Sequence, residues 1–249
     1  MIVHDLRNPR AVALHREITA RIPQLDDADD DLLVVIGGDG FFLHTIHAHG
    51  FDRRYLGLNG GTLGFLLNDV QGRLDEVCGA IVDHRWREYD FPLLQARVHT
   101  TLGQEHVGHA MNDVYLERAS GQTARLDLDI GGRGLQRLSA DGVIFATALG
   151  STAYNFSAGG VPVDPGLPVM CVTPICPHKP KLSPFVLPYG TEVDCAVHAP
   201  DRRPVRAVID GRDVLDVARM RIEPAEQTVK LIYLAGHDFT GQMMEKLLT

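Results

Sequence analysis

Apolar positions in the first third of the chain predict helices that alternate with strands. From Pro9, the residues Leu14, Ile18, Ile22 and Leu25 recur at the spacing of an amphipathic helix. The continuous apolar run 32–36 is typical of a parallel strand that is covered on both faces. The pattern then predicts a helix from Phe41 to about Ile46, a strand at 55–58 and a helix over 71–84, and a solvated loop for the acidic run 26–31.

After Trp86 the spacing of apolar residues changes from the period of helices to the period of strands. Residues 125–130, 193–197 and 205–209 alternate apolar and polar side chains, as half-exposed antiparallel strands do. Helical spacing returns at 148–157 and again at 240–248. We therefore expect an α/β domain over 1–87, an all-β sandwich-like domain over 88–235, and a C-terminal segment, 236–249, that packs back on the first domain.

Composition excludes several classes of protein. With 24 Lys and Arg against 32 Asp and Glu, the net charge of −8 argues against nucleic-acid binding through a broad positive field. No stretch approaches the ~20 apolar residues of a membrane span, and the N-terminus does not have the pattern of a secretory signal. Four dispersed cysteines form no C-x-x-C pair, so we expect a reducing, cytoplasmic location and no membrane partner.

Glycine is the unusual component of this composition. There are 25 glycines, and they concentrate in residues 37–64 and 131–166. Glycine is favoured where the backbone needs positive φ or must approach a ligand or another backbone closely. These two regions are therefore the places to look for a binding site.

The first glycine turn, 37–40, follows the apolar strand and precedes a predicted helix. In α/β proteins such a turn holds phosphate with backbone N–H groups and a helix N-terminus. The sequence Gly-Gly-Asp-Gly is neither a Walker A loop nor a G-x-G-x-x-G fingerprint. Asp39 would repel phosphate, so it either closes an Asx-turn, binds Mg²⁺, or accepts a proton from an attacking hydroxyl.

A second turn, 59–66, also follows a strand and should lie at the same carboxyl edge of the sheet. Within it, Phe65 can stack on a base or simply pack in the core. Further along, Asn112 and Asp113 stand between apolar residues and have the groups to hold an adenine edge and a ribose hydroxyl. A plain turn is the competing interpretation for this pair.

The richest segment runs from Asp141 to Gly160. A predicted strand leads into Gly150 and then into the hydroxyl-rich sequence Ser-Thr-Ala-Tyr-Asn-Phe-Ser, which favours a nucleotide-binding surface with Tyr154 available for stacking. Ser151 is not in a G-x-S-x-G context, so it is not expected to be a nucleophile. His44, His47 and His49 lack the Cys or Glu partners of a metal site, and we assign no metal to them.

Together these segments resemble the NAD kinase family over most of the chain from Leu32. The motifs that carry the resemblance are G-G-D-G at 37–40, N-x-G-x-L-G-F-L at 59–66, the pair at 112–113 where the family has Asn-Glu, and G-S-T-A-Y at 150–154, the most specific of the four. Diacylglycerol and sphingosine kinases share only the first motif. The alternatives are therefore a lipid kinase of that type and a non-catalytic NAD(P) sensor.

The resemblance implies a Rossmann-like N-terminal lobe, a β-sandwich-like C-terminal domain and an active site between them. It implies phosphorylation of the adenosine ribose 2′-hydroxyl of NAD, with ATP or polyphosphate as donor and a divalent metal, Mg²⁺, carried by the donor. Asp39 takes the role of general base, and Gly37, Gly38, Gly40 and Asn59 hold the donor phosphates. Self-association to a dimer or tetramer is also implied. The residues assigned to NAD are Asp39, Gly40, His44, Phe65, Asn112, Asp113, Asp141, Thr152, Ala153, Tyr154, Asn155, Phe156 and Ser157.

Overall fold

The computed structural model describes residues 1–23, 25, 31–60 and 64–248. Most of the acidic run (26–30) and Gly61–Leu63 of the second glycine turn lie outside the described residues. The chain divides into two compact units, Met1–Phe91 with Gln227–Thr249 (unit 1) and Pro92–Glu226 (unit 2). No helix in the described part of the chain combines the length and hydropathy that spanning a membrane requires.

Unit 1 is built on a parallel sheet with the strand order β1-β2-β3-β15, as the continuous apolar runs predict. Its strands are β1 (Ile2–His4), β2 (Leu32–Gly37), β3 (Arg54–Asn59) and the end of β15 (Val217–Leu234). Its helices are α1 (Pro9–Arg21), α2 (Asp39–His49), α3 (Leu74–Val82) and α5 (Phe239–Leu248). Every residue of β2 is buried, which is the expected state of a central parallel strand.

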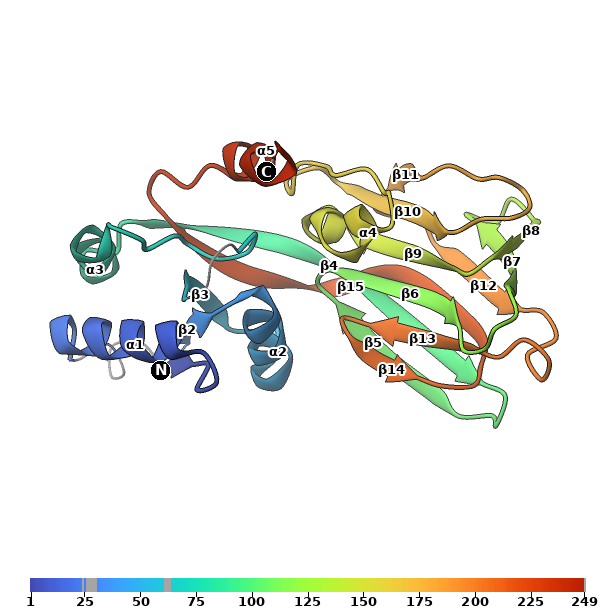
Figure 1. Ribbon diagram of the computed structural model, residues 1–249, viewed down its shortest axis with the longest axis horizontal. Coiled ribbons are helices and arrows are strands. Elements are labelled where there is room, and N and C mark those ends of the chain that lie inside the picture. The colour runs from blue at the N-terminus through green and yellow to red at the C-terminus, as the bar shows by residue number, and fades with distance from the viewer. Residues whose placement is uncertain (24, 26–30, 61–63, 249) are drawn as a thin grey trace. The chain divides into compact units, whose positions relative to one another are not determined.

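Helices cover both faces of this sheet (Figure 1). Ile18 of α1 and Val77 of α3 share one apolar cluster with alternate residues of β2, while Phe42 of α2 packs edge-on against Tyr55 of β3. Phe239, the first residue of α5, packs against Phe91 and Tyr233, so the start of this helix belongs to the core of unit 1.

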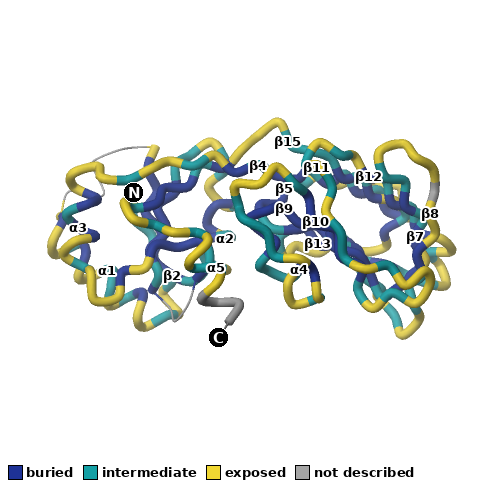
Figure 2. The backbone as a smooth tube through the Cα atoms, turned by 90° about the horizontal axis from the view of Figure 1, so that it is seen from above, coloured by how far each residue is buried: buried dark blue, intermediate teal, exposed yellow. Residues whose placement is uncertain are grey.

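Unit 2 consists of two mainly antiparallel sheets packed face to face. One has the strand order β11-β10-β9-β6-β13-β14; in the other, β5 pairs with β4, β4 with β15, and the order continues β15-β12-β7-β8. Leu94, Leu126, Val114 and Phe145, drawn from both sheets, meet in one buried cluster, which makes the unit a β-sandwich. Figure 2 shows long buried stretches along the central strands of this unit, such as β9, and exposed connecting loops.

The strands of unit 2 are the larger part of β4 (Trp86–Thr100), from Pro92 onward, the start of β15, and the strands β5 (Glu105–Ala110), β6 (Asp113–Arg118), β7 (Ala124–Ile130), β8 (Leu135–Ala140), β9 (Gly142–Thr147), β10 (Val169–Ile175), β11 (Phe185–Pro188), β12 (Val193–Val197), β13 (Val205–Ile209) and β14 (Arg212–Val214). The three alternating segments of the sequence are thus β7, β12 and β13, as predicted. Between β7 and β8, Gly131, Gly132 and Gly134 take positive φ in the turn of a hairpin.

Two expected helices differ from the pattern for local reasons. The first helix ends at Arg21 rather than reaching Leu25, because Pro23 disfavours helical backbone at Ile22. Residues 148–157 form a 3₁₀ turn, η1 (Leu149–Thr152), and one short helix, α4 (Tyr154–Ser157), instead of one helix. Ala153 breaks the two with a ψ of −131°.

Candidate active site

The first glycine turn places the start of α2 at the carboxyl edge of the parallel sheet. Gly37 ends β2, Gly38 is the N-cap of α2, and no described side chain caps that end of the helix. A Cβ at Gly38 or at Gly40 would meet nothing within 4 Å, so the backbone here faces open space. An uncapped helix N-terminus with small residues around it is suited to bind phosphate.

Asp39 lies in the first turn of α2, and its carboxylate points to the second glycine motif. Its Oδ2 accepts a hydrogen bond from the Phe65 N–H at 2.6 Å, and its Oδ1 accepts one from the Leu66 N–H at 3.1 Å. A Cβ at Gly64 would lie only 2.9 Å from Oδ1. The structure therefore brings together two motifs that are about 25 residues apart in the chain, and the absence of a side chain at Gly64 leaves room for this close approach.

A buried tyrosine supports the segment that holds Asp39. The Tyr233 hydroxyl donates to the Leu66 carbonyl at 3.2 Å, and its side chain is almost completely buried. Burial, with a further contribution from the charge of Asp39, raises the pKa of Tyr233, so this hydroxyl keeps its proton and remains a donor. Tyr233 was not found by sequence reasoning, because nothing in its local pattern distinguishes it from a core residue of a strand.

Asn59 and Gly60 lie beside the first glycine turn and line a pocket of about 520 Å³. The Gly60 N–H donates to the Gly37 carbonyl at 2.9 Å, which ties the ends of the two motifs together. Arg10, near the N-terminus of α1, lines the same pocket. Among the other residues predicted in this unit, Phe65 is partly exposed and His44 is fully on the surface of α2.

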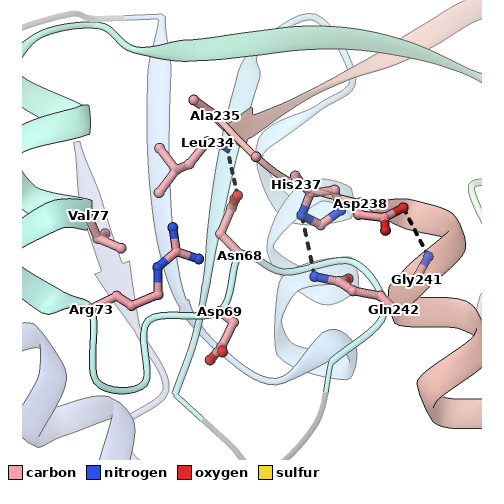
Figure 3. Close-up of a pocket in the computed structure, with 11 residues that line it drawn as sticks. Asn68, Asp69, Arg73, Val77, Leu234, Ala235, His237, Asp238, Gly241 and Gln242 are labelled. Atoms are coloured by element: carbon pink, nitrogen blue, oxygen red, sulfur yellow. Dashed lines mark hydrogen bonds between the residues drawn. The ribbon is translucent and has the colours of Figure 1, made fainter.

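A smaller pocket of about 220 Å³ lies between the turn that follows Asn68 and the start of α5 (Figure 3). None of the predicted site residues lines it. Asn68 forms part of its wall and is a structural link: its amide donates to the Gly57 and Ile232 carbonyls at 2.9 and 3.0 Å, and its Oδ1 accepts the Leu234 N–H at 2.8 Å. It thereby joins β3 to the end of β15, next to Tyr233.

In unit 2, Asn112 and Asp113 form a tight corner where β6 begins. The carboxylate of Asp210 accepts hydrogen bonds from the N–H groups of Met111, Asn112 and Asp113 at 2.6, 2.9 and 3.1 Å. The Asn112 Oδ1 is buried and has no hydrogen-bond partner among the described residues. A buried acceptor without a partner is costly, so this atom is a good candidate for a ligand contact.

Asp113 is buried, and this controls its charge. Burial raises the pKa of this carboxyl to about 7, the nearby charge of Asp210 raises it as well, and a hydrogen bond from the backbone N–H of Tyr154 lowers it in part. The same hydrogen bond connects the corner to the hydroxyl-rich segment. Asp113 therefore exchanges its proton near neutral pH, where an ordinary Asp is fully ionised.

The hydroxyl-rich segment, 150–157, packs directly on this corner. A Cβ at Gly150 would overlap the Asn112 backbone, so only glycine fits there. The ring of Tyr154 meets Tyr115 edge-on at 4.9 Å. The side chains of Thr152, Ala153 and Tyr154 are partly exposed, and those of Phe156 and Ser157 are exposed, so all five are open to a ligand.

Asn155 is an exception among the predicted contacts. Its side chain is fully buried; its amide donates to the Ser151 and Val161 carbonyls at 2.8 and 3.2 Å, and its Oδ1 accepts the Thr173 hydroxyl at 2.7 Å. With these partners satisfied inside the protein, we assign Asn155 to the support of this segment and not to direct contact with a ligand.

Asp141 lies apart from the other predicted residues of unit 2. It precedes β9, whereas the corner and Tyr154 lie beyond its far end, about 20 Å away at the rise of an extended strand. Its carboxylate pairs with Arg118 at 2.9 Å. Within one copy of the chain, the structure does not bring Asp141 to Asn112 or Tyr154.

No three His, Cys, Asp or Glu side chains among the described residues are grouped so that they could hold a metal ion. His47 packs edge-on against Phe51 at 5.2 Å, and His44 and His49 are exposed on α2.

Comparison with known proteins agrees with this geometry. Residues 111–233 match the family model of the ATP-NAD kinase C-terminal domain. The chain is 34% identical to the NAD kinase of Xanthomonas campestris pv. campestris (strain 8004) over 240 residues, which cover 95% of this chain and 92% of the relative. It is 36% identical to the NAD kinase of Zymomonas mobilis over 199 residues, covering 77% and 75% of the two chains. The chain belongs to the NAD kinase family.

Solved structures show the same relationship. The crystal structure of yeast NADH kinase complexed with NADH matches with a TM-score of 0.86 at 25% identity, covering 99% of this chain and 86% of that one. An NAD kinase from Archaeoglobus fulgidus shares the fold, with a TM-score of 0.76 at 21% identity over 99% and 97% of the two chains. The predicted family, fold class and kinase activity toward NAD are thus confirmed, and neither the lipid kinase nor the sensor is favoured. The roles of individual residues remain predictions.

Proposed function

We propose that this chain transfers the γ-phosphoryl group of ATP to the 2′-hydroxyl of the adenosine ribose of NAD, giving NADP and ADP. The observation that supports this most strongly is the Asp39 carboxylate, which two backbone N–H groups orient beside an uncapped helix N-terminus. A hydroxyl is a weak nucleophile, and a fixed carboxylate within hydrogen-bond reach can take its proton.

In this proposal unit 1 carries the phosphoryl transfer. Asp39 accepts the proton of the 2′-hydroxyl, the ribose oxygen forms a bond to the γ-phosphorus, and the bond from that phosphorus to the β–γ bridging oxygen breaks. The backbone at Gly37, Gly38 and Gly40, with Asn59, holds the donor phosphates at the positive end of α2. Mg²⁺ would enter with ATP and neutralise charge on its phosphates.

Unit 2 is proposed to bind NAD. The free Asn112 Oδ1 would accept a hydrogen bond from the adenine amino group, and Asp113 would bind a ribose hydroxyl. Thr152, Ala153, Tyr154, Phe156 and Ser157 provide a partly open surface with an aromatic ring for stacking. His44 and Phe65 in unit 1 remain further candidates for NAD contact.

Self-association to a dimer or tetramer and a cytoplasmic location are part of the same proposal. The position of Asp141, at the other end of β9 from Tyr154, favours a role toward NAD held by a second copy of the chain. Light scattering of the purified chain, with and without NAD, is the direct check; a strict monomer would remove this role from Asp141.

The activity is tested by incubating the purified chain with NAD or NADH, with ATP or polyphosphate, and with Mg²⁺, and by measuring NADP(H). We expect NADP from NAD and ATP. Phosphorylation of diacylglycerol without NADP formation would establish the lipid kinase. Tight binding of NAD(P) by calorimetry without any product would establish the sensor.

A further inference from the structure

Asp210 occupies a hairpin turn whose chemistry alone does not require a carboxylate. It joins β13 to β14 with Gly211, and both residues take positive φ, 45° and 80°. A two-residue turn with both φ values positive favours Asn-Gly as much as Asp-Gly. The turn itself accepts either residue, so a role for the Asp210 carboxylate has to be sought in the groups that it contacts.

The Asp210 carboxylate is used by the neighbouring corner of unit 2. It accepts the N–H groups of three consecutive residues, 111–113, while the Asp210 N–H donates back to the Asp113 carbonyl at 3.0 Å. Hydrogen bonds to a charged acceptor are stronger than those to a neutral one. An amide in its place would present an NH₂ group to one or more of these donors.

Thr147 holds the same corner from the other side. Its hydroxyl, which is buried, donates to the Met111 carbonyl at 2.6 Å and accepts the Gly150 N–H at 3.0 Å, and its own N–H donates to the Asn112 carbonyl at 2.9 Å. The backbone on both sides of Asn112 is thus fixed by Asp210 and Thr147 together.

We propose that Asp210 and Thr147 are positioning residues for the NAD site: they set the backbone of Asn112 and Asp113, and through it the direction of the unpartnered Asn112 Oδ1. The inference rests on the proposed function, because it takes the adenosine half of NAD as the ligand of this corner. Neither residue is assigned a contact with substrate.

The first test is Asp210→Asn, which keeps the turn preference and nearly the same size. We expect the KM and the calorimetric Kd for NAD to rise roughly 10- to 100-fold, the order of magnitude that loss of a hydrogen bond to a charged group has in an equilibrium constant, while kcat and the KM for ATP stay unchanged. The control is Asp213→Asn, which removes an exposed carboxylate paired with Arg206 and should change none of these values. A folded Asp210→Asn variant with unchanged KM and Kd for NAD overturns the inference.

If Asp210→Asn does not fold, Thr147→Val and Thr147→Ser give an independent test. Valine has nearly the shape of threonine but loses both hydroxyl hydrogen bonds, whereas serine keeps them. We expect Thr147→Val to weaken NAD binding and Thr147→Ser to retain it. The same Kd for NAD in both variants overturns the inference. An inactive wild-type chain would reject the proposed function, and the Kd values for NAD would still decide the roles of Asp210 and Thr147.

Discussion

Asp39 of unit 1 and Asp113 of unit 2 are both carboxylates in predicted site motifs, but their surroundings are opposite. Asp39 is partly exposed, and two backbone N–H groups fix its oxygens. Asp113 is 5% exposed and lies near a second carboxylate, and its pKa is raised to about 7. A carboxylate that is fixed by hydrogen bonds can accept a proton from a substrate. A buried carboxyl group whose pKa lies near neutral pH is suited to the recognition of a ligand.

The way each unit builds its motif also differs. In unit 1 the motif side chain is held by backbone groups of a glycine-containing segment, so few side chains are needed. In unit 2 the backbone is held by polar side chains, the partly exposed Asp210 and the buried Thr147 and Asn155. We therefore expect substitutions in unit 1 to reduce turnover, and substitutions in unit 2 to reduce NAD affinity or stability.

The largest effect should follow Asp39→Asn, which removes the proton acceptor but keeps the side-chain volume. We expect kcat to fall about a thousandfold, within the range for loss of a general base, with the Kd for NAD unchanged. Steady-state kinetics and calorimetry measure the two quantities. Asp83→Asn, an exposed carboxylate paired with Arg85 in the same unit, is the matched control and should be fully active. Full activity of Asp39→Asn would contradict the role of Asp39 as proton acceptor and, with it, the contrast drawn between Asp39 and Asp113.

Asp113 should make the protein less stable as the pH rises. Its pKa in the folded state is above that of an unfolded Asp, so the native state binds the extra proton between about pH 4 and pH 7. The stability that this proton contributes is fully present below about pH 4 and is lost as the pH rises through about 7. Asp113→Asn should remove this dependence and gain up to about 3–4 kcal/mol relative to wild type between pH 4 and pH 8. Urea unfolding at several pH values measures it. An identical pH dependence in both proteins would contradict the proposed burial of the charge.

Asn155→Ala should destabilise unit 2 by about 2–3 kcal/mol, because the buried hydrogen bonds to the Ser151 carbonyl and from the Thr173 hydroxyl are lost, together with a part-buried one to Val161. We expect this loss in thermal or urea unfolding, and only a secondary change in NAD affinity at a temperature where the variant is folded. A large loss of NAD affinity with unchanged stability would restore Asn155 as a ligand contact. Asn59→Ala, at the partly exposed end of β3, provides the comparison for an amide that lines a pocket.

The smallest effect is expected for Gly64→Ala. The added methyl group would lie 2.9 Å from Asp39 Oδ1, which is too close, so the carboxylate must shift. We expect kcat to fall about tenfold, because proton transfer depends on this position. Gly121→Ala is the control, since a Cβ there meets nothing. An unchanged kcat would show that the close approach of Gly64 is a packing feature alone.

Much of the fold was predictable because the hydrophobic pattern is strong. The run 32–36 and the alternation at 125–130, 193–197 and 205–209 gave strands at the observed places. Residues 148–157 were mistaken for one helix, because the hydrogen bonds of Ser151 with Val163 and the contact of Gly150 with Asn112 are long-range. Such contacts override local spacing and leave no periodic signal.

The motif residues of the candidate site were predictable from the sequence, but the hydrogen-bond network that holds them in place was not. The motifs gave Asp39 and the pair Asn112–Asp113, yet not the residues that hold them, Tyr233 and Asp210. The Asp-Gly pair at 210–211 signals a hairpin in the sequence, but the direction of its carboxylate depends on how β13 lies beside β6. That pairing joins residues about 90 positions apart, and no local pattern encodes it.

The central claim is that unit 1 carries the chemistry and unit 2 carries the affinity. It is tested most directly by measuring kcat and the Kd for NAD in Asp39→Asn and Asn112→Ala side by side. The account predicts that Asp39→Asn loses about a thousandfold in kcat at unchanged Kd, whereas Asn112→Ala weakens NAD binding at unchanged kcat. The account is contradicted if Asp39→Asn weakens NAD binding and Asn112→Ala lowers kcat. It is also contradicted if both variants lose kcat and NAD affinity in parallel.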